Sequence, residues 1–85
     1  MKEIRIIGIL ITDRIKEAGQ TQRVLSNFAH VIKSRLGFHE VTEAVCSRMG
    51  IIMLQLGGSV EEQDKLENAL NQIRGIEVRR MQFEI

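Results

Sequence analysis

The sequence lacks proline, tryptophan and tyrosine, and it contains a single cysteine, Cys46. The absence of proline argues against linkers or disordered tails, and a lone cysteine excludes a disulfide within the chain. Twelve basic residues balance eleven acidic ones, so the net charge of +1 provides no excess positive field for a phosphate backbone. The apolar run at the N-terminus is too short for a signal peptide or a membrane span. We therefore expect a cytoplasmic protein that contacts no membrane and does not bind nucleic acid by itself.

The residues that are present suit one folded domain, which we expect to span residues 1–85. The chain is 44% hydrophobic and 27% charged, as is typical of ordered globular proteins. A chain of this length buries only about 60% of the surface that its unfolded form exposes. Association with other copies would therefore stabilise it.

The hydrophobic period predicts the order β-α-β-β-α-β. The stretch from Ile4 to Ile11 is β-branched and apolar on both faces from Ile6 onward, which is typical of a central strand. From about Lys16 to Leu36 the apolar residues recur at helical spacing, and Gly37 then suits the position after a helix end. Phe38 to Arg48 alternates loosely, which favours an edge strand or a partly solvated segment.

The second half of the chain repeats this pattern. The turn at Met49-Gly50 leads into a predicted strand from Ile51 to Leu56, so residues 38–56 read as a hairpin. Ser59 and Glu62 fit a capping box at the start of a helix that stops at Gly75. In the last segment the apolar residues change phase at Arg79-Arg80, which indicates either a bulge or a strand whose far end faces a different partner.

This order predicts a ferredoxin-like α+β sandwich, a four-stranded antiparallel sheet with both helices on one face. The first and third strands would be central and the second and fourth would be edges. No helix remains to cover the second face, from which Ile7, Ile9 and Ile11 or their alternates must project. Exposed aliphatic side chains are costly at about 25 cal/mol per Å². We therefore predict a homo-oligomer, a dimer or a dimer of dimers, that associates through the sheet.

The candidate effector site lies in the loops after the first strand and around residues 37–40. Asp13 and Arg14 begin the first of these loops, and Phe38 and His39 belong to the second. We expect a small-molecule effector there, with helix capping and a local ion pair as the alternative for Asp13 and Arg14. His30 reads as a half-buried or surface histidine.

His39 and Cys46 are the residues closest to a metal site. Their separation of seven residues places them on opposite faces of a straight strand, about 23 Å apart. This spacing excludes a shared metal within one chain, although ligands from two subunits could still meet. We therefore predict no metal and no cofactor.

Two other features have structural explanations. The turn Gly57-Gly58-Ser59 matches an anion nest weakly and a helix cap well. The acidic residues at the start of the second predicted helix suit a solvated face better than a hard-cation site. These acidic residues are Glu61, Glu62, Asp64 and Glu67.

The sequence resembles a small bacterial family described as putative iron-only hydrogenase system regulators. The resemblance runs from Ile4 to about Arg80 and rests on structural motifs. These motifs are Val24-Leu25-Ser26-Asn27-Phe28, Ile32, Arg35-Leu36-Gly37-Phe38, Met49-Gly50-Ile51-Ile52 and Ile73-Arg74-Gly75-Ile76-Glu77-Val78. It implies an ACT-like fold, association through the sheet, a regulatory role, and similarity to the C-terminal domain of the nickel-responsive repressor. That repressor carries several histidines on its second strand and a cysteine opening its third, where this chain has His39 and Met49-Gly50.

Three classes of function follow. The first is a regulatory, ligand-sensing oligomer that acts through a protein partner or a small effector. In the repressor a DNA-binding half precedes the sensor domain, whereas this chain begins directly at the first strand, so a transcriptional effect would need a partner. The second is a nucleic-acid-binding regulator, which requires a basic face assembled by symmetry. That face would comprise Arg35, Arg48, Arg74, Arg79 and Arg80. The third, an enzyme, is disfavoured because no nucleophile, base and oxyanion donors converge in the sequence.

Overall fold

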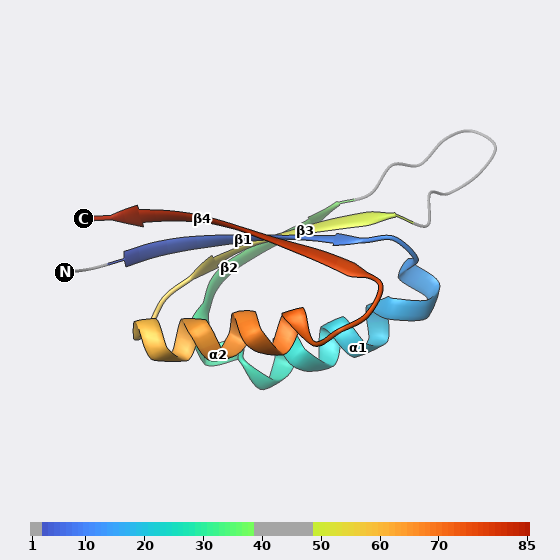
Figure 1. The fold of residues 1–85 in the computed structure, drawn as a ribbon, viewed down its shortest axis with the longest axis horizontal. Helices are drawn as coiled ribbons and strands as arrows, with labels where there is room; N and C mark the ends of the chain where they lie inside the picture. The colour runs from blue at the N-terminus through green and yellow to red at the C-terminus, as the bar shows by residue number, and fades with distance from the viewer. Residues whose placement is uncertain (1–2, 39–48) are drawn as a thin grey trace.

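Two helices cover one face of a four-stranded antiparallel sheet in the computed structural model, which describes residues 3–38 and 49–85 (Figure 1). The elements in chain order are β1 (Glu3–Ile11), α1 (Arg14–Asn27), the short 3-10 helix η1 (Ala29–Val31), β2 (Ile32–Phe38), β3 (Gly50–Leu56), α2 (Val60–Asn71) and β4 (Ile76–Glu84). The strand order β2-β3-β1-β4 places β1 and β3 in the centre and β2 and β4 at the edges. The predicted ferredoxin-like βαββαβ fold is confirmed.

The hydrophobic core lies between the sheet and the helices. Ile7 and Ile9 of β1 are fully buried, and they face Leu66 and Leu70 of α2 within one cluster that also contains Leu25 of α1. A fully buried side chain of this size contributes about 1.5–3 kcal/mol to folding. This layer fixes the register of the sheet, because a slip of one residue would turn the inward side chains of β1 outward.

The first helix is shorter than the sequence predicts. α1 ends at Asn27, where the Phe28 amide donates to the carbonyl oxygens of both Val24 and Leu25, at 3.2 and 3.3 Å. After η1 the backbone of Ile32 is extended, with φ −94° and ψ 114°. The predicted helix from Lys16 to Leu36 is therefore wrong beyond Asn27, and from Ile32 onward pairing with β3 outweighs a periodicity that fits both conformations.

The second strand consequently lies closer to the N-terminus than predicted. β2 occupies Ile32–Phe38, so the strand predicted from Phe38 to Arg48 is misplaced, and residues 39–48 lie outside the described part of the chain. Gly37, predicted just beyond a helix end, instead lies in β2 opposite Ile52. The pairing of β2 with β3 is nevertheless antiparallel, as the hairpin prediction requires.

The second helix begins as predicted. The Ser59 hydroxyl accepts a hydrogen bond from the Glu62 amide at 3.1 Å, and it also lies 3.4 Å from a Glu62 carboxylate oxygen to which it can donate. The helix ends at Asn71, four residues before the predicted stop at Gly75, which reverses the chain with a positive φ of 88°. None of the helices in residues 3–38 and 49–85 is long and apolar enough to cross a bilayer.

The last strand pairs with β1 without interruption. The register runs one to one from Glu3 opposite Glu84 to Ile11 opposite Ile76, so the first of the two predicted alternatives, a bulge at Arg79-Arg80, is wrong. The change of phase has another cause. Ile76 and Val78 pack against the core, whereas Met81 and Phe83 project from the opposite face of the sheet. The far end of β4 therefore presents its apolar side chains away from the helices.

Candidate functional site

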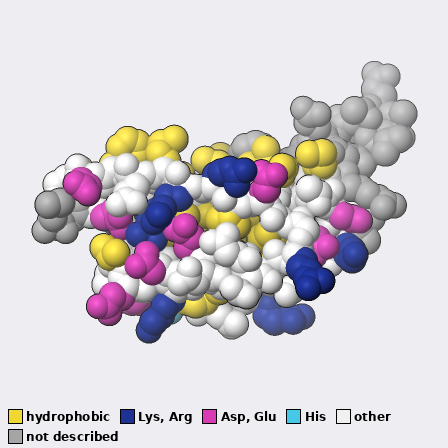
Figure 2. Space-filling model, viewed as in Figure 1, with side chains coloured by type: hydrophobic (Ala, Val, Ile, Leu, Met, Phe, Trp, Pro, Cys, Tyr) yellow, Lys and Arg dark blue, Asp and Glu magenta, His cyan; other side chains and the backbone are white. Residues whose placement is uncertain are grey.

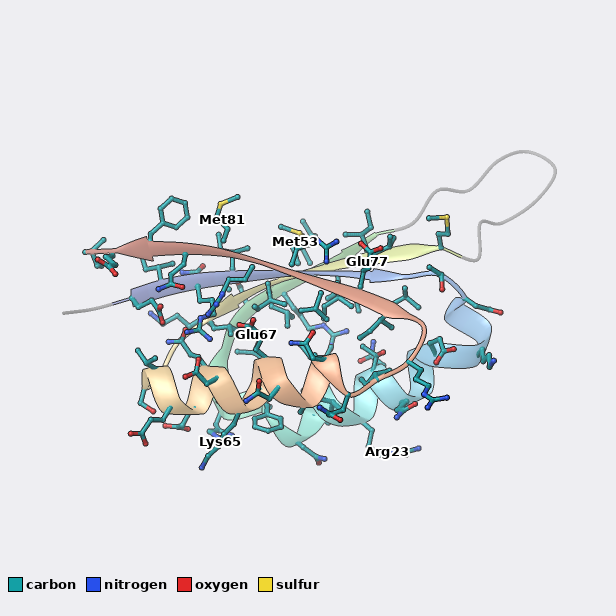
Figure 3. The ribbon with its side chains drawn as sticks, in the orientation of Figure 1. Arg23, Met53, Lys65, Glu67, Glu77 and Met81 are labelled. Carbon is teal, nitrogen blue, oxygen red and sulfur yellow. The ribbon has the colours of Figure 1, made fainter. Side chains whose placement is uncertain are left out.

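The sheet face turned away from the helices, here called the open face, carries the second apolar layer of the protein. Strand alternation and the ladder registers place on it Ile4, Ile6, Gly8 and Leu10 of β1, Ser34 and Leu36 of β2, Ile51, Met53 and Gln55 of β3, and Glu77, Arg79, Met81 and Phe83 of β4. Figure 3 shows Met53, Met81 and Glu77 on the side of the sheet opposite to α2. These open-face positions are thus the alternates of the core residues Ile7, Ile9 and Ile11.

Several large apolar side chains on the open face are exposed. Leu36 is 63% exposed, Met81 55% and Phe83 48%. In the space-filling view, yellow hydrophobic side chains follow the sheet edge of the molecule (Figure 2). Large exposed apolar side chains on several neighbouring strands are typical of an interaction surface rather than of a solvated one.

The centre of the open face is low. Gly8 has no side chain, and a Cβ placed on it would lie 3.5 Å from the Met53 sulfur and 4.0 Å from the Arg79 carbonyl oxygen. Toward β2 the face forms a hollow of about 310 Å³. Its lining includes Ile6, Ser34 and Met53. One water occupies about 30 Å³ of liquid, so this hollow is large enough for a side chain.

Charged side chains lie on the β4 part of the open face. The Arg79 guanidinium lies 3.3 Å from a Glu77 carboxylate oxygen, and both side chains are largely exposed. A second Arg79 nitrogen donates to the Val78 carbonyl oxygen at 3.2 Å. An exposed pair of this kind contributes at most about 1 kcal/mol to folding. It therefore marks an edge of the apolar surface that stays in contact with water.

A buried arginine lies on the helix side of the sheet, at the end where β1 begins. Arg5 is 1% exposed, and its guanidinium contacts Asp64 at 2.8 Å, Glu3 at 2.9 Å and Glu67 at 3.1 Å. Arg80 lies 3.6 Å from the same Glu67 carboxylate, which Figure 3 shows between the sheet and α2. Burial lowers the pKa of Arg5, but the hydrogen bond to Asp64 and the charge of Glu3 outweigh this, so its pKa is raised. The cluster joins β1, β4 and α2.

The Arg5 cluster corrects one sequence interpretation and reveals one omission. Glu67, predicted on a solvated face, is largely buried against Arg5, whereas Asp64 contacts Arg5 and stays half exposed as predicted. The signal was present in the sequence, because Arg5 shares the inward phase of Ile7 and Ile9 and therefore needs carboxylates beneath it. Two buried polar atoms in the described part of the chain have no partner, Arg5 Nε and Gln63 Oε1, and one is a donor and the other an acceptor.

The remaining acidic and histidine residues keep their predicted places. Glu61 is exposed on the first turn of α2. A Glu62 carboxylate oxygen lies 3.1 Å from His30 Nε2, and both side chains are exposed, so His30 is a surface histidine. Within residues 3–38 and 49–85, no group of three potential ligands is arranged to hold a metal ion.

The predicted effector residues are only partly described. The Asp13 carbonyl oxygen accepts from the amides of Lys16 and Glu17, and its carboxylate lies 3.4 Å from the Lys16 amide, so Asp13 caps α1. Arg14 is the first residue of α1, and Phe38 ends β2 at the same end of the sheet as Asp13. His39 lies outside the described residues.

The turn before α2 has a structural role. The methylenes of Lys33 lie across Gly57, and a Cβ there would approach Lys33 Cε to 2.9 Å. The Ser59 hydroxyl is engaged in the cap, so the capping interpretation of Gly57-Gly58-Ser59 is confirmed. A hollow of about 420 Å³ adjoins this turn and is lined in part by Lys33 and Gln63.

The arginines proposed for a basic face are dispersed over the described structure. Arg79 lies on the open face, whereas its neighbour Arg80 contacts Glu67 on the helix side. Arg35 is exposed on β2 and points to the helix side, opposite Leu54. Arg74 follows α2, and Arg48 lies outside the described residues.

Comparison with known proteins identifies the family. Residues 3–80 match the TM1266-like family, described as "Iron-only hydrogenase system regulator, putative". The chain belongs to this family. The solved structure of the uncharacterized protein TM1266 from Thermotoga maritima is similar with 30% identity and a TM-score of 0.80, over 98% of this chain and 100% of that one. None of the curated proteins matches the chain.

More distant structures share the fold alone. The nitrogen regulatory PII-like protein CPII from Thiomonas intermedia K12 is 10% identical in its apo form, with a TM-score of 0.59 over 99% of this chain and 92% of that one. The de novo designed protein Foldit4 is 16% identical, with a TM-score of 0.58 over 99% of both chains. Because a designed protein is as close as a natural regulator, the fold does not determine function here.

Proposed function

We propose that this TM1266-like chain, as one ACT-like domain of residues 1–85, is a regulatory module of the iron-only hydrogenase system that works as an assembly of copies joined through the open face. The observation that carries the proposal is the exposed apolar layer on a sheet whose other face already holds the core. Burying such a layer against a second copy removes apolar surface from water at about 25 cal/mol per Å². A symmetric pair also needs only one self-complementary patch.

A charge placed on the open face tests this assembly. We expect Met81→Glu to dissociate the oligomer in sedimentation velocity, because association would bury a carboxylate against apolar side chains. Val60→Glu is the matched control, since Val60 is 46% exposed, close to Met81, but belongs to α2. Dissociation by both substitutions, or by neither, would contradict the proposal.

We further propose that a small effector binds where Asp13, Arg14, Phe38 and His39 follow their strands. Support comes from the topology, in which the ends of β1 and β2 lie at one end of the sheet with only β3 between them. CPII from Thiomonas intermedia K12 has been solved with ADP, AMP and bicarbonate, so adenine nucleotides belong in the set of compounds to test. The regulatory effect would then pass to a protein partner.

Thermal unfolding against amino acids, nucleotides and divalent metals tests the effector. A ligand at 100 times its Kd stabilises the folded state by about 2.7 kcal/mol, which raises the Tm. Asp13→Asn keeps a capping side chain for α1 and removes the charge. We expect this variant to unfold at the wild-type temperature without ligand and to lose the ligand-induced shift. The absence of a shift for every compound with the wild-type protein would argue against sensing.

A further inference from the structure

We infer that two copies pack face to face about a two-fold axis that runs parallel to the strands, so that Met81 of each copy enters the hollow beside β2 of the other. This inference rests on the proposed association through the open face and specifies its geometry. The arguments come from the ladder registers and from the relief of the face.

The open face is arranged in rows that cross all four strands. One row runs from β2 to β4 through Ser34, Gln55, Ile6 and Met81. The next row runs through Leu36, Met53, Gly8 and Arg79. Neighbouring strands lie about 4.8 Å apart, so the two ends of a row are about 14 Å apart.

The two ends of the first row differ in height. At its β2 end lies the hollow of about 310 Å³, which Ser34 lines. At its β4 end Met81 projects, 55% exposed, and Figure 3 shows its side chain rising from the sheet. One copy therefore offers both a protruding side chain and a recess, at opposite edges of the same row.

Only one of the two simple symmetry axes brings these features together. An axis parallel to the strands, between β1 and β3, exchanges β4 with β2 of the other copy and keeps each row on itself. Met81 then lies over the hollow at Ser34. An axis across the strands that passes between the Ser34 and Leu36 rows lays each strand over its own copy. The two hollows then face each other and leave a void whose lining loses dispersion contacts.

The centre of the face fits the same axis. Exchange of β1 with β3 places Met53 of one copy over Gly8 of the other, beside that copy's own Met53. Packed sheets are rotated by about 30° relative to each other, which shifts contacts along the strands by about one residue at the edges and by less in the centre. The central contact is therefore the one least changed by sheet twist.

The charged pair can be accommodated with the parallel axis. Glu77 and Arg79 belong to the edge strand β4, which then lies above the other copy's edge strand β2. Both charges can extend past this edge to water, so the pair does not have to be buried.

Cysteine cross-linking between subunits separates the two geometries. The parent is Cys46→Ser, and the test protein adds Ser34→Cys and Met81→Cys; each single variant is the control. The reagent is a bismaleimide with an arm shorter than the roughly 14 Å that separates Ser34 from Met81 within one copy. We expect a covalent dimer on a denaturing gel from the double variant and from a mixture of the two single variants, but not from either single variant alone.

The outcomes distinguish the geometry from the association itself. Covalent dimers from Ser34→Cys alone, with no increase in the double variant, would mean that each strand lies over its own copy and would overturn the inference. A monomeric parent in sedimentation would overturn the inference together with the proposed assembly. If Met81→Cys itself dissociates the dimer, Leu36→Cys with Arg79→Cys in the next row replaces the pair, and the same pattern of cross-links decides.

Discussion

Neighbouring residues of β1 belong to two different layers of the protein. Ile7 and Ile9 are fully buried beneath the helices, whereas Ile6 and Leu10 on the open face are only half-buried. The residue type is nearly the same on both sides, so composition does not separate the layers. The difference is that the helix side is complete within one copy, while the open side is apolar and still largely in contact with solvent. The first layer explains the fold, and the second points to assembly.

The largest expected loss of stability comes from the core between the sheet and the helices. We expect Ile9→Ala to lower the free energy of unfolding by about 2–5 kcal/mol, because it leaves a cavity among closely packed side chains. Leu10→Ala, one residue along on the open face, is the matched control. Urea unfolding at low and high protein concentration should show a constant cost for Ile9→Ala and a cost for Leu10→Ala that grows with concentration. Equal, concentration-independent costs would remove the distinction between the layers.

The Arg5 cluster is the charged part of the layer between the sheet and the helices. We expect Arg5→Met to destabilise the protein by about 2–3 kcal/mol, since Glu3 loses its arginine contact and Glu67 keeps only the longer contact to Arg80. This is less than the 3–5 kcal/mol expected for breaking a fully buried pair, because Asp64 is half exposed. Arg35→Met, at an exposed position of β2, should change the stability by no more than about 0.5 kcal/mol. Similar denaturant midpoints for both variants would show that the cluster adds little.

The cap at the start of α2 tests how much a local hydrogen bond contributes to the stability of the fold. We expect Ser59→Ala to cost about 1 kcal/mol, because the Glu62 amide loses its acceptor. Ser26→Ala, at an exposed position of α1, should be neutral or slightly stabilising, since alanine favours helix. Thermal unfolding of the two variants gives the comparison. A cost at position 26 as large as that at position 59 would rule out the cap as the cause.

The smallest effect on folding is expected at the centre of the open face. A Cβ at Gly8 would make an ordinary contact with the Met53 sulfur at 3.5 Å, so Gly8→Ala should leave the monomer as stable or up to about 1 kcal/mol more stable. If Met53 of a second copy packs there, the same methyl group should weaken association. Sedimentation equilibrium would show a raised dimer dissociation constant. An unchanged constant would place the contact elsewhere.

Local patterns in the sequence were sufficient for much of the fold. The run from Ile4 to Ile11 is apolar on both faces from Ile6 onward, and its strand is central. Ser59 marked the start of α2. The strands are apolar on both faces, but two helices can cover only one of them, so the sequence correctly implied an uncovered sheet face. These features depend on short-range chemistry or on a simple count of layers, both of which a sequence displays.

Features that depend on distant contacts were missed. Val31, Ile32 and Leu36 fit a helical stripe as well as a strand, and only pairing with β3 selects the strand. The place of Arg5 is fixed by Asp64 and Glu67, which lie about sixty positions further along the chain. The open face as a candidate site was predicted from its apolar count, but its hollow and its low centre at Gly8 depend on the register between strands.

The central claim is that the open face is covered by a second copy. Sedimentation velocity of the wild-type chain over a dilution series into the nanomolar range tests it most directly. We predict a dimer or a dimer of dimers at micromolar concentration, which dissociates on dilution. A monomer throughout the series would contradict the account, since the apolar layer of the open face would then remain in water.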